Sequence, residues 1–271
     1  MRSDAEILDE LNALDRSRKA PPYRPRDAAT LIVIDGAGDD LKVLMGRRHL
    51  RHRFMPGALV FPGGRVDPGD SRVRLADDYD PRVLAALRVA MHGPKTAART
   101  RAFAVAAIRE TWEETGVLIG TAAAGSAAPL GAAAVPLPDA PPPDPHDAFA
   151  VFAARQLRPS LTPMRFIARA ITPPGRPRRF DTRFLAVPAS AIAGRSADGL
   201  GPSGELEEVA FVTLAEARAH VDLAPITRAV LDELERRLAV DPGLDGAAPV
   251  PFYRWARDRF VREEITGESA S

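Results

Sequence analysis

The 271-residue sequence contains no cysteine. This absence excludes disulfides, zinc sites with cysteine ligands, cysteine-held iron–sulfur clusters and thiol nucleophiles. The five histidines are scattered, and none forms an HxxxH pair. A bound metal ion would therefore depend on oxygen ligands, which favours a hard cation such as Mg²⁺ or Mn²⁺.

The sequence also lacks an excess of one charge and lacks long hydrophobic runs. Its 37 basic and 36 acidic residues give a formal net charge of +1, so composition offers no electrostatic case for nucleic acid or membrane binding. No apolar run is long enough to span a membrane, and the charged N-terminus does not resemble a signal peptide. We therefore expect a cytoplasmic monomer or homodimer with no nucleic acid or membrane partner.

What the sequence does contain is an alternation of strand-like and helix-like segments. Hydrophobic residues make up 45% and charged residues 27%, as in an ordinary globular protein. Apolar periodicity predicts strands at 30–34, 42–45, 58–61, 117–119, 165–171, 180–187 and 208–212. It predicts helices at 81–91, 100–115, 146–156, 214–219 and 225–238. This order indicates an α+β fold with a mixed sheet between helices.

The domain organisation follows from the same patterns. We expect a single domain over 1–271, because no linker divides the chain into two hydrophobic units. Residues at about 121–146 are rich in Ala, Pro and Gly, which indicates a surface insertion. From about 214 onward we expect a helical C-terminal extension.

Three glutamates on the predicted helix 100–115 carry the chemistry. Glu110, Glu113 and Glu114 stand at i, i+3 and i+4, so they share one helix face. Arg109 can pair with Glu113, but Glu110 and Glu114 have no basic partner at helical spacing. A divalent cation would relieve the repulsion, whereas the alternative is a solvated acidic face. The apolar stripe on the same helix comprises Val105, Ile108 and Trp112.

Residues 109–117, RETWEETGV, resemble the core of the Nudix box, G-x5-E-x7-R-E-U-x-E-E-x-G-U, where U is aliphatic. The run FPGG, ending at Gly64, is similar to the opening of that box. Asp70 occupies the position of the first glutamate, and Thr111 that of an aliphatic residue. Between Asp70 and Arg109 lie 38 residues where the pattern has seven. The resemblance therefore implies an insertion of 31 residues, at about 71–100, inside a split box that runs from Gly64 to Val117.

The resemblance implies a Nudix α/β/α sandwich that hydrolyses a nucleoside diphosphate linked to another group. Two or three Mg²⁺ or Mn²⁺ ions would lie between the three glutamates and a small-molecule diphosphate substrate. Gly64 and Asp70 would also face the metals, and Glu207 is a further candidate. Arg109 would orient Glu113.

The insertion inside the box and the flank at 43–67 resemble the peroxisomal coenzyme A diphosphatase-type branch and its bacterial relatives. This branch implies cleavage of coenzyme A or acyl-coenzyme A to adenosine 3′,5′-bisphosphate and (acyl-)4′-phosphopantetheine. Two alternatives stay open. One is a pyrophosphatase for ADP-ribose or a dinucleoside polyphosphate, and the other is a catalytically silent Nudix domain that senses a nucleotide.

Substrate contacts are expected from arginines, whose guanidinium groups match phosphate oxygens. Arg47, in a basic cluster before the box, and the turn residues Arg178 and Arg179 are the candidates. The acidic run Asp77–Asp80 is interpreted as solvated surface. An apolar groove for the pantetheine arm is expected along the insertion, with walls from Val83, Leu84, Leu87 and Val89.

Overall fold

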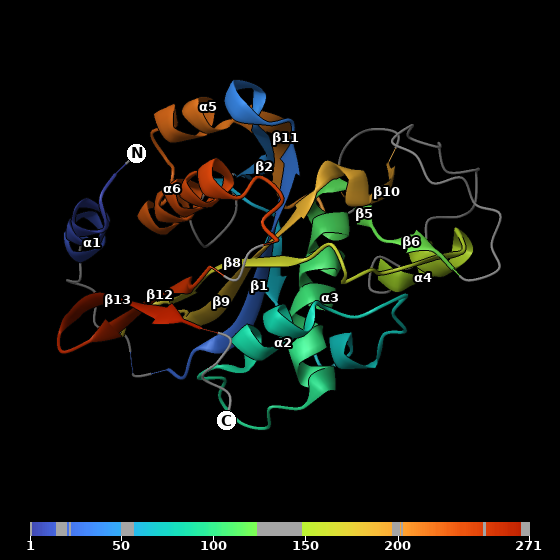
Figure 1. The fold of residues 1–271 in the computed structure, drawn as a ribbon, viewed down its shortest axis with the longest axis horizontal. Coiled ribbons are helices and arrows are strands. Elements are labelled where there is room, and N and C mark those ends of the chain that lie inside the picture. The colour runs from blue at the N-terminus through green and yellow to red at the C-terminus, as the bar shows by residue number, and fades with distance from the viewer. Residues whose placement is uncertain are drawn as a thin grey trace.

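A nine-stranded mixed sheet organises the fold (Figure 1). The computed structural model describes residues 2–14, 21, 23–49, 57–123, 148–196, 201, 203–245 and 248–266. The sheet contains β1 (Arg26–Asp35), β2 (Lys42–Arg48), β3 (Leu59–Val60), β4 (Gly63–Arg65), β8 (Arg165–Ile171), β9 (Phe180–Pro188), β11 (Leu206–Thr213), β12 (Val250–Ala256) and β13 (Arg259–Ile265). Its order is β11-β2-β1-β9-β8-β12-β13, with β3 paired to β2 and β4 to β1.

The remaining elements surround this sheet. The helices are α1 (Asp4–Asn12), α2 (Pro81–Arg88), α3 (Ala97–Thr115), α4 (Ala148–Ala154), α5 (Leu214–Ala219) and α6 (Pro225–Val240). Short 3-10 turns are η1 (Gly38–Asp40), η2 (Asp70–Arg72) and η3 (Ala189–Ala191). Two ribbons lie outside the sheet, β5 (Val117–Ile119) with β10 (Ile192–Arg195) and β6 (Thr121–Ala122) with β7 (Leu157–Arg158).

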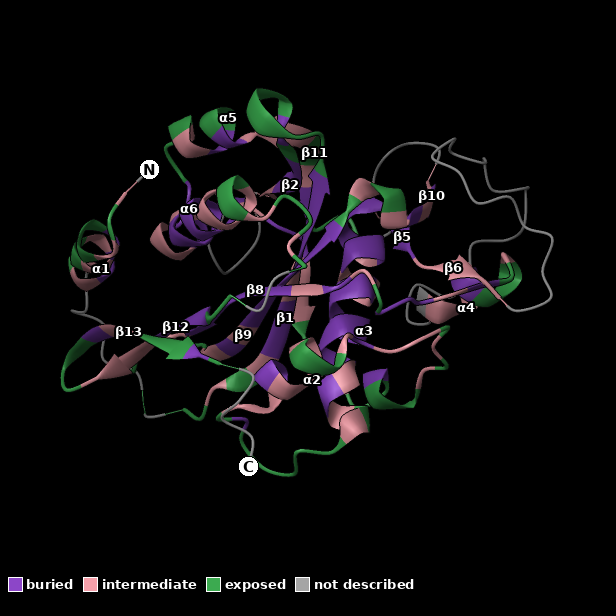
Figure 2. Cartoon of the chain, viewed as in Figure 1, coloured by how far each residue is buried: buried purple, intermediate pink, exposed green. Residues whose placement is uncertain are grey.

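The central strand β1 shows why helices cover both faces of the sheet. Successive side chains of a strand point to opposite faces. Leu31 and Val33 pack into one core together with α3, whereas Ile32 and Ile34 pack into a second core together with α1 and α6. Figure 2 shows the resulting layers, with buried strands between helices. The predicted α+β class and α/β/α sandwich are therefore confirmed, and the parallel pairs β1–β9 and β8–β12 make the sheet mixed.

Helix α3 is the longest helix described and forms for clear local reasons. The Thr96 side chain accepts a hydrogen bond from the backbone of Arg99 at the N-terminus. Gly116 ends the helix in the left-handed conformation at φ 67°, which glycine adopts without strain. The predicted apolar stripe of Val105, Ile108 and Trp112 is buried, as expected.

The elements after residue 160 match the sequence prediction closely, except at the end of the chain. Strands β8 and β9 and helices α5 and α6 lie at the predicted positions. The helical interpretation of the C-terminal extension is wrong for residues 250–265, which form the antiparallel hairpin β12–β13. Here the consecutive residues Phe252 and Tyr253, paired with β8, are both buried in the cores on opposite faces of the sheet, which favours sheet extension over a helix.

Helix α1 was not predicted from the sequence, although its start carries a readable signal. Ser3 and Glu6 form a capping box, in which each side chain accepts a hydrogen bond from the backbone of the other residue. Only Ile7 and Leu11 of this helix are buried, so its apolar periodicity is too short to stand out. None of the helices in the described part of the chain combines the length and hydrophobicity needed to cross a bilayer.

The insertion at 71–100 is fastened to the core at its outgoing end by its acidic run. The Asp77 carboxylate accepts hydrogen bonds from the backbone of Leu161 and Thr162 at 2.6 and 2.9 Å. The Asp78 carboxylate pairs with Arg101 of α3. The run is partly exposed, as expected for surface, with the Asp78 side chain 39% exposed, but the carboxylates of Asp77 and Asp78 also hold the insertion against neighbouring segments. The insertion at 121–146 lies mostly outside the described residues.

The returning end of the insertion is fastened by arginines of the sheet and of α3. Arg169 donates to the carbonyls of Val89 and Ala90 at 2.9 and 3.0 Å. Arg99 donates to the Asp27 carboxylate at the start of β1, at 2.7 Å. Both ends of the insertion are thus anchored, and α3 begins at a fixed place.

A buried ion-pair network lies beneath the returning end of the insertion. Asp181 pairs with Arg169 at 2.7 Å and with Arg183 at 3.1 Å, and all three side chains are at most 1% exposed. The two guanidinium groups stack on the rings of Phe252 and Phe103, at 4.3 and 4.1 Å from the ring centres. The carboxylate of Asp181 therefore compensates two cations that have lost their hydration.

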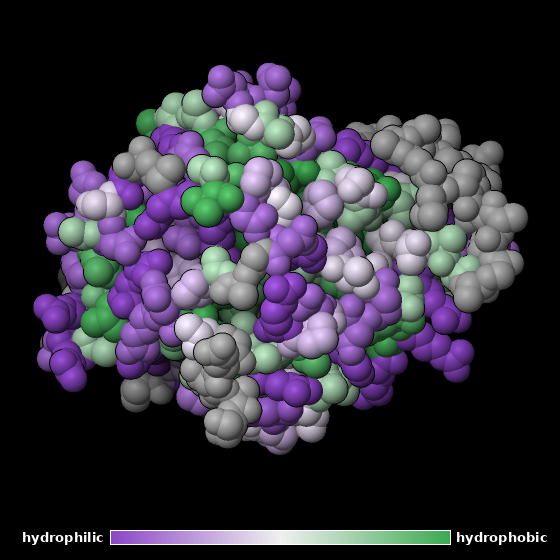
Figure 3. All heavy atoms as spheres, viewed as in Figure 1, coloured by the Kyte–Doolittle hydropathy of each residue, from purple (hydrophilic) through white to green (hydrophobic). Residues whose placement is uncertain are grey.

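The surface of the molecule contrasts with this interior. Figure 3 shows that the face seen there is largely hydrophilic, with hydrophobic residues in scattered groups. Scattered apolar residues of this kind are normal on a protein surface and indicate no docking face.

We predict that Asp181→Ala lowers the free energy of unfolding by about 3–5 kcal/mol, because it removes the carboxylate that pairs with the buried Arg169 and leaves Arg183 with Asp27 alone, at 3.3 Å. Asp245→Ala serves as the control. Asp245 also pairs with an arginine, Arg165, but its side chain is 70% exposed, so its loss should cost under about 1 kcal/mol. Urea unfolding of both variants measures the difference, and equal losses would contradict the role assigned to the network.

Candidate active site

The three glutamates lie in the last two turns of α3, on the side that faces β4. Their exposure differs: the side chains of Glu110 and Glu113 are 17% and 20% exposed, and Glu114 is 2% exposed. The C-terminal end of a helix carries partial negative charge and disfavours acidic side chains. Neither the helix nor the core gains stability from carboxylates here, which points to function.

The glycine turn before η2 supports two of these carboxylates. The backbone amide of Gly63 donates a hydrogen bond to Glu114 Oε2 at 2.9 Å. The Gly64 backbone lies directly against the Glu110 carboxylate, and a Cβ at position 64 would overlap it. The FPGG run thus contacts two of the helix glutamates, and a side chain at position 64 would displace the Glu110 carboxylate from its present place.

Arg109 connects the two halves of the split box. Its Nε and Nη2 donate to the two oxygens of Asp70 at 3.0 and 3.2 Å, and its Nη1 donates to Glu110 and Glu113 at 2.9 and 3.1 Å. One Asp70 oxygen also accepts from the backbone of Asp67 at 2.7 Å. Asp70 is 3% exposed, and both of its oxygens are engaged, so it holds Arg109 and does not face the open side of the cluster.

Burial and mutual repulsion act together on the glutamates. Burial is the main cause that raises the pKa of Glu110 to about 7, with Arg109 opposing it and the charge of Glu113 adding to it. Burial and then the charge of Glu110 raise the pKa of Glu114 to about 8. The pKa of Glu113 is raised as well, again chiefly by burial. The cluster is thus short of positive charge at neutral pH.

These properties fit a divalent cation. Every donor is a carboxylate or carbonyl oxygen, which hard cations prefer, and the carboxylates are desolvated and mutually repelling. Within the described ranges, no three acidic or histidine side chains already converge into a finished metal cage. Arg109 holds Glu110 and Glu113 in this arrangement, so an ion would have to draw their free oxygens together.

The loop that leads into β11, with residues 201 and 203–205, covers the C-terminal end of α3. The backbone of Ser203 donates to the Glu113 carbonyl at 2.8 Å. Gly201 lies so close to the backbone of Glu113 and Thr115 that a Cβ would overlap it. This packing brings Glu205, at the end of the loop, to the glutamate cluster.

The position of Glu205 changes which acidic residue near the start of β11 is the candidate for the site. The charge of Glu205 contributes to the raised pKa of both Glu110 and Glu114. Glu207, the residue chosen from the sequence, instead pairs with His49 at 3.0 Å and is 46% exposed. Sequence reasoning could not separate them, because the choice depends on how the loop packs on α3.

Arg47, the expected phosphate contact, forms contacts on the far side of β2 from α3. Its Nε lies 3.2 Å from a Glu208 oxygen, and its Nη2 lies 3.5 Å from the ring of His220, at the end of α5. Helix α5 packs into the core shared with α6. Arg47 is therefore oriented away from the glutamates.

Strand alternation assigns the opposite orientation to Arg48. Leu44 belongs to the core beside α3 and Met45 to the core beside α6. Arg47 shares the face of Met45, and Arg48 shares the face of Leu44. In agreement, the charge of Arg48 opposes the raised pKa of Glu114. Arg48 is thus the arginine of this pair that faces the site.

The other expected arginines lie at the β8–β9 turn. Arg179 donates to the carbonyls of Thr172 and Tyr23 at 3.0 and 2.7 Å, and Arg178 is exposed. The structure gives neither residue a contact with the glutamates within its described part. The expected groove of the insertion is also not formed by Val83, Leu84, Leu87 and Val89, which pack into or against the core beside α3.

The fold and the site together define a class of hydrolase. In this class a helix that carries carboxylates packs on a mixed sheet, next to a glycine-rich strand. A solved Nudix hydrolase from Alicyclobacillus acidocaldarius is 30% identical to this chain, with a TM-score of 0.57, and the match covers 81% of this chain and 93% of that one. The chain therefore belongs to the Nudix hydrolase superfamily. No family model and no curated protein matches the sequence.

More distant matches share lower identity. One is the Nudix domain of Shewanella oneidensis NrtR complexed with ADP ribose, at 14% identity and a TM-score of 0.39, covering 88% of this chain and 99% of that one. Another is a C. elegans Ap4A hydrolase, at 15% identity and a TM-score of 0.37, covering 79% and 98%.

The raised pKa of Glu114 predicts how the metal-free protein responds to pH. An acid whose folded pKa is about 8, against 4.5 for the ordinary value, stabilises the fold while protonated and loses this contribution as pH rises through 8. Metal-free protein should therefore lose up to about 1.4 kcal/mol of unfolding free energy per pH unit, relative to Glu114→Gln, between pH 5 and 8. The glutamine keeps an oxygen for the Gly63 amide, so it is a fair reference.

Chemical denaturation at several pH values in EDTA measures this difference. Excess Mg²⁺ should remove most of it, because the ion favours the ionised carboxylate. If the unfolding free energies of the wild type and the variant depend on pH in the same way in EDTA, the pKa of Glu114 is not raised in the folded protein.

Proposed function

We propose that the protein hydrolyses the diphosphate of coenzyme A or acyl-coenzyme A to adenosine 3′,5′-bisphosphate and (acyl-)4′-phosphopantetheine. The observation that carries the reaction class is the contact of Glu110 and Glu114 with Gly64 and Gly63, despite 38 intervening residues between Asp70 and Arg109. The resemblance of the flank at 43–67 supports the coenzyme A substrate. We further propose that residues 1–271 act as one domain, in the cytoplasm, as a monomer or homodimer.

Mg²⁺ or Mn²⁺ would be held by Glu110, Glu113 and Glu114, with the Gly64 carbonyl as a further oxygen. When bound, such ions stabilise negative charge on the phosphate oxygens and make water more acidic. Asp70, expected from the sequence as a ligand, is better assigned as a positioning residue, because its oxygens are engaged by Arg109 and the Asp67 amide.

Three residues of the protein are assigned the remaining roles in the reaction. Arg109 fixes the orientation of Glu110 and Glu113. Arg48, on the α3 face of β2, is positioned to contact a phosphate, a role transferred from Arg47. Glu205 is the candidate proton acceptor, because it lies beside the cluster without belonging to α3. Water adds its oxygen to one phosphorus, its proton passes to the acceptor, and the bridging oxygen leaves with the other phosphoryl group.

Glu113→Gln and Glu114→Gln should each lower kcat by roughly a hundredfold or more, because each removes charge that stabilises the transition state through the ion. Glu205→Gln should also lower kcat, by at least about tenfold. Glu207→Gln is the matched control, since it makes the same change two residues away, and it should stay within about threefold. Steady-state assays with Mg²⁺, together with thermal melts, test these changes. Equal activity of wild type and the α3 variants would show that the carboxylates are only a charged surface.

The substrate is tested by product analysis with coenzyme A, ADP-ribose and a dinucleoside tetraphosphate. Coenzyme A should give the two products named above and the highest kcat/KM. Arg48→Ala should lower this value about ten- to hundredfold, as expected for a lost charge-assisted contact of about 1.5–3 kcal/mol, whereas Arg47→Ala should change it little. Preference for ADP-ribose would overturn the coenzyme A assignment but leave the reaction class. No turnover of any diphosphate would favour a nucleotide-sensing domain.

A further inference from the structure

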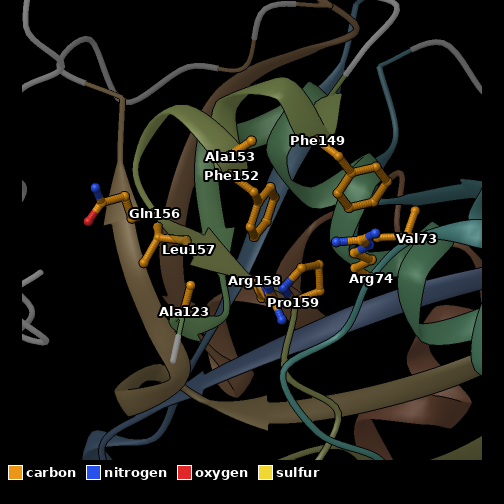
Figure 4. A pocket seen from close by; sticks show the side chains of 10 residues that line it. All are labelled: Val73, Arg74, Ala123, Phe149, Phe152, Ala153, Gln156, Leu157, Arg158 and Pro159. Atoms are coloured by element: carbon orange, nitrogen blue, oxygen red, sulfur yellow. The ribbon is translucent and has the colours of Figure 1, made fainter. Parts of the chain in front are cut away.

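A cavity of about 580 Å³ lies beside α4, and none of the three glutamates lines it (Figure 4). Helix α4, the segment Leu157–Pro159 and the residues that follow η2 form its walls. Val73 and Leu157 contribute aliphatic surface. None of these residues has a role in the proposed reaction.

Aromatic rings give the cavity a firm apolar wall. Phe149 and Phe152 project from α4 with ring centres 5.5 Å apart, and Figure 4 shows both rings directed toward the cavity. Phe152 is 2% exposed, so it is fixed by the core beside α3, while Phe149 is half-buried. Such a wall favours an apolar ligand, because burial of apolar surface drives binding.

The charges around the cavity all have one sign. Arg74 and Arg158 line it, and no acidic residue does so within the described chain. Among the residues that the structure describes, neither guanidinium group has an ion pair or hydrogen bond partner. Arg158 is half-buried and Arg74 is exposed, so both guanidinium groups are open to a ligand at the edge of the cavity. Two arginines at an apolar wall favour an anion with an apolar body.

The cavity begins close to the split box. Val73 lies three residues after Asp70, which Arg109 holds. A 3-10 segment such as η2 rises about 2 Å per residue, which places Val73 roughly 6 Å along the chain from Asp70. The cavity wall is therefore close along the chain to the residue that holds Arg109.

We propose that this cavity binds an aliphatic chain that carries a carboxylate. The chain would lie against Phe149 and Phe152, and the carboxylate would be held by Arg74 and Arg158. Two sources offer this chemistry. One is the far end of an acyl group on the nucleotide substrate, which would deepen the proposed function, and the other is a free carboxylic acid.

Octanoate is the probe, measured by calorimetric titration of the full chain. Octylamine, which has the same chain length and the opposite charge at neutral pH, is the control ligand. Octanoate should bind saturably and octylamine should not. The double variant Arg74→Gln/Arg158→Gln should weaken octanoate about ten- to hundredfold, as for a lost charge-assisted contact. Arg72→Gln, an exposed arginine outside the cavity, should leave the affinity unchanged.

A second variant tests the cavity without altering charge. Ala153→Phe adds a ring to an exposed position of α4 that lines the cavity, so it should abolish octanoate binding and leave the melting temperature within a few degrees.

Steady-state kinetics separate the two sources. Octanoate that raises KM for the nucleotide identifies the substrate's acyl end, and octanoate that binds without affecting KM identifies a free acid. The titration does not require turnover, so failure of the proposed function leaves this test intact. Octanoate binding that survives both the double variant and Ala153→Phe, or equal binding of octylamine, would overturn the proposal.

Discussion

The contact between Arg109 and Asp70 is the constraint on which the active-site geometry depends. The first part of the box ends at Asp70, and the second begins 39 positions later at Arg109. One guanidinium group bonds both oxygens of Asp70 and also reaches Glu110 and Glu113. Because Asp70 is itself fixed by the Asp67 amide, the glutamates are oriented from the far side of the insertion. An aspartate suffices there, since its oxygens meet the arginine directly.

The insertion is tolerated because both of its ends are held by specific bonds. Asp77 and Asp78 hold the outgoing end, and Arg169 and Arg99 hold the returning end. The entropic cost of loop closure rises only slowly with loop length. A long insertion between fixed ends therefore need not disturb the site. Arg169 also belongs to the buried network around Asp181, which links the stability of the sheet to the placement of α3.

What could be predicted from the sequence depended on periodicity within one element. Helix α3 and strands β8 and β9 were found because their apolar patterns and end signals are local. The choices of Arg47 and Glu207 depend on which face of a strand or loop meets α3, and periodicity within one element does not show this. Only tertiary packing places Arg48 and Glu205 at the cluster.

The hairpin β12–β13 shows the same limit at the level of the fold. The sequence predicted a helical extension there, but pairing with β8 makes the end of the chain part of the sheet. The local sequence pattern thus identified the types of functional side chain, whereas long-range strand pairing and packing determine which of these side chains lie together.

A titration of metal-free protein with Mn²⁺, followed by the electron paramagnetic resonance signal of the free ion, tests the central claim most directly. The wild type should bind Mn²⁺ at the α3 glutamates. Asp70→Asn should weaken this binding by about tenfold or more, because it loosens Arg109 and with it Glu110 and Glu113. Wild-type protein that binds no Mn²⁺, or an Asp70→Asn variant with unchanged affinity, would contradict the claim that this contact assembles the site.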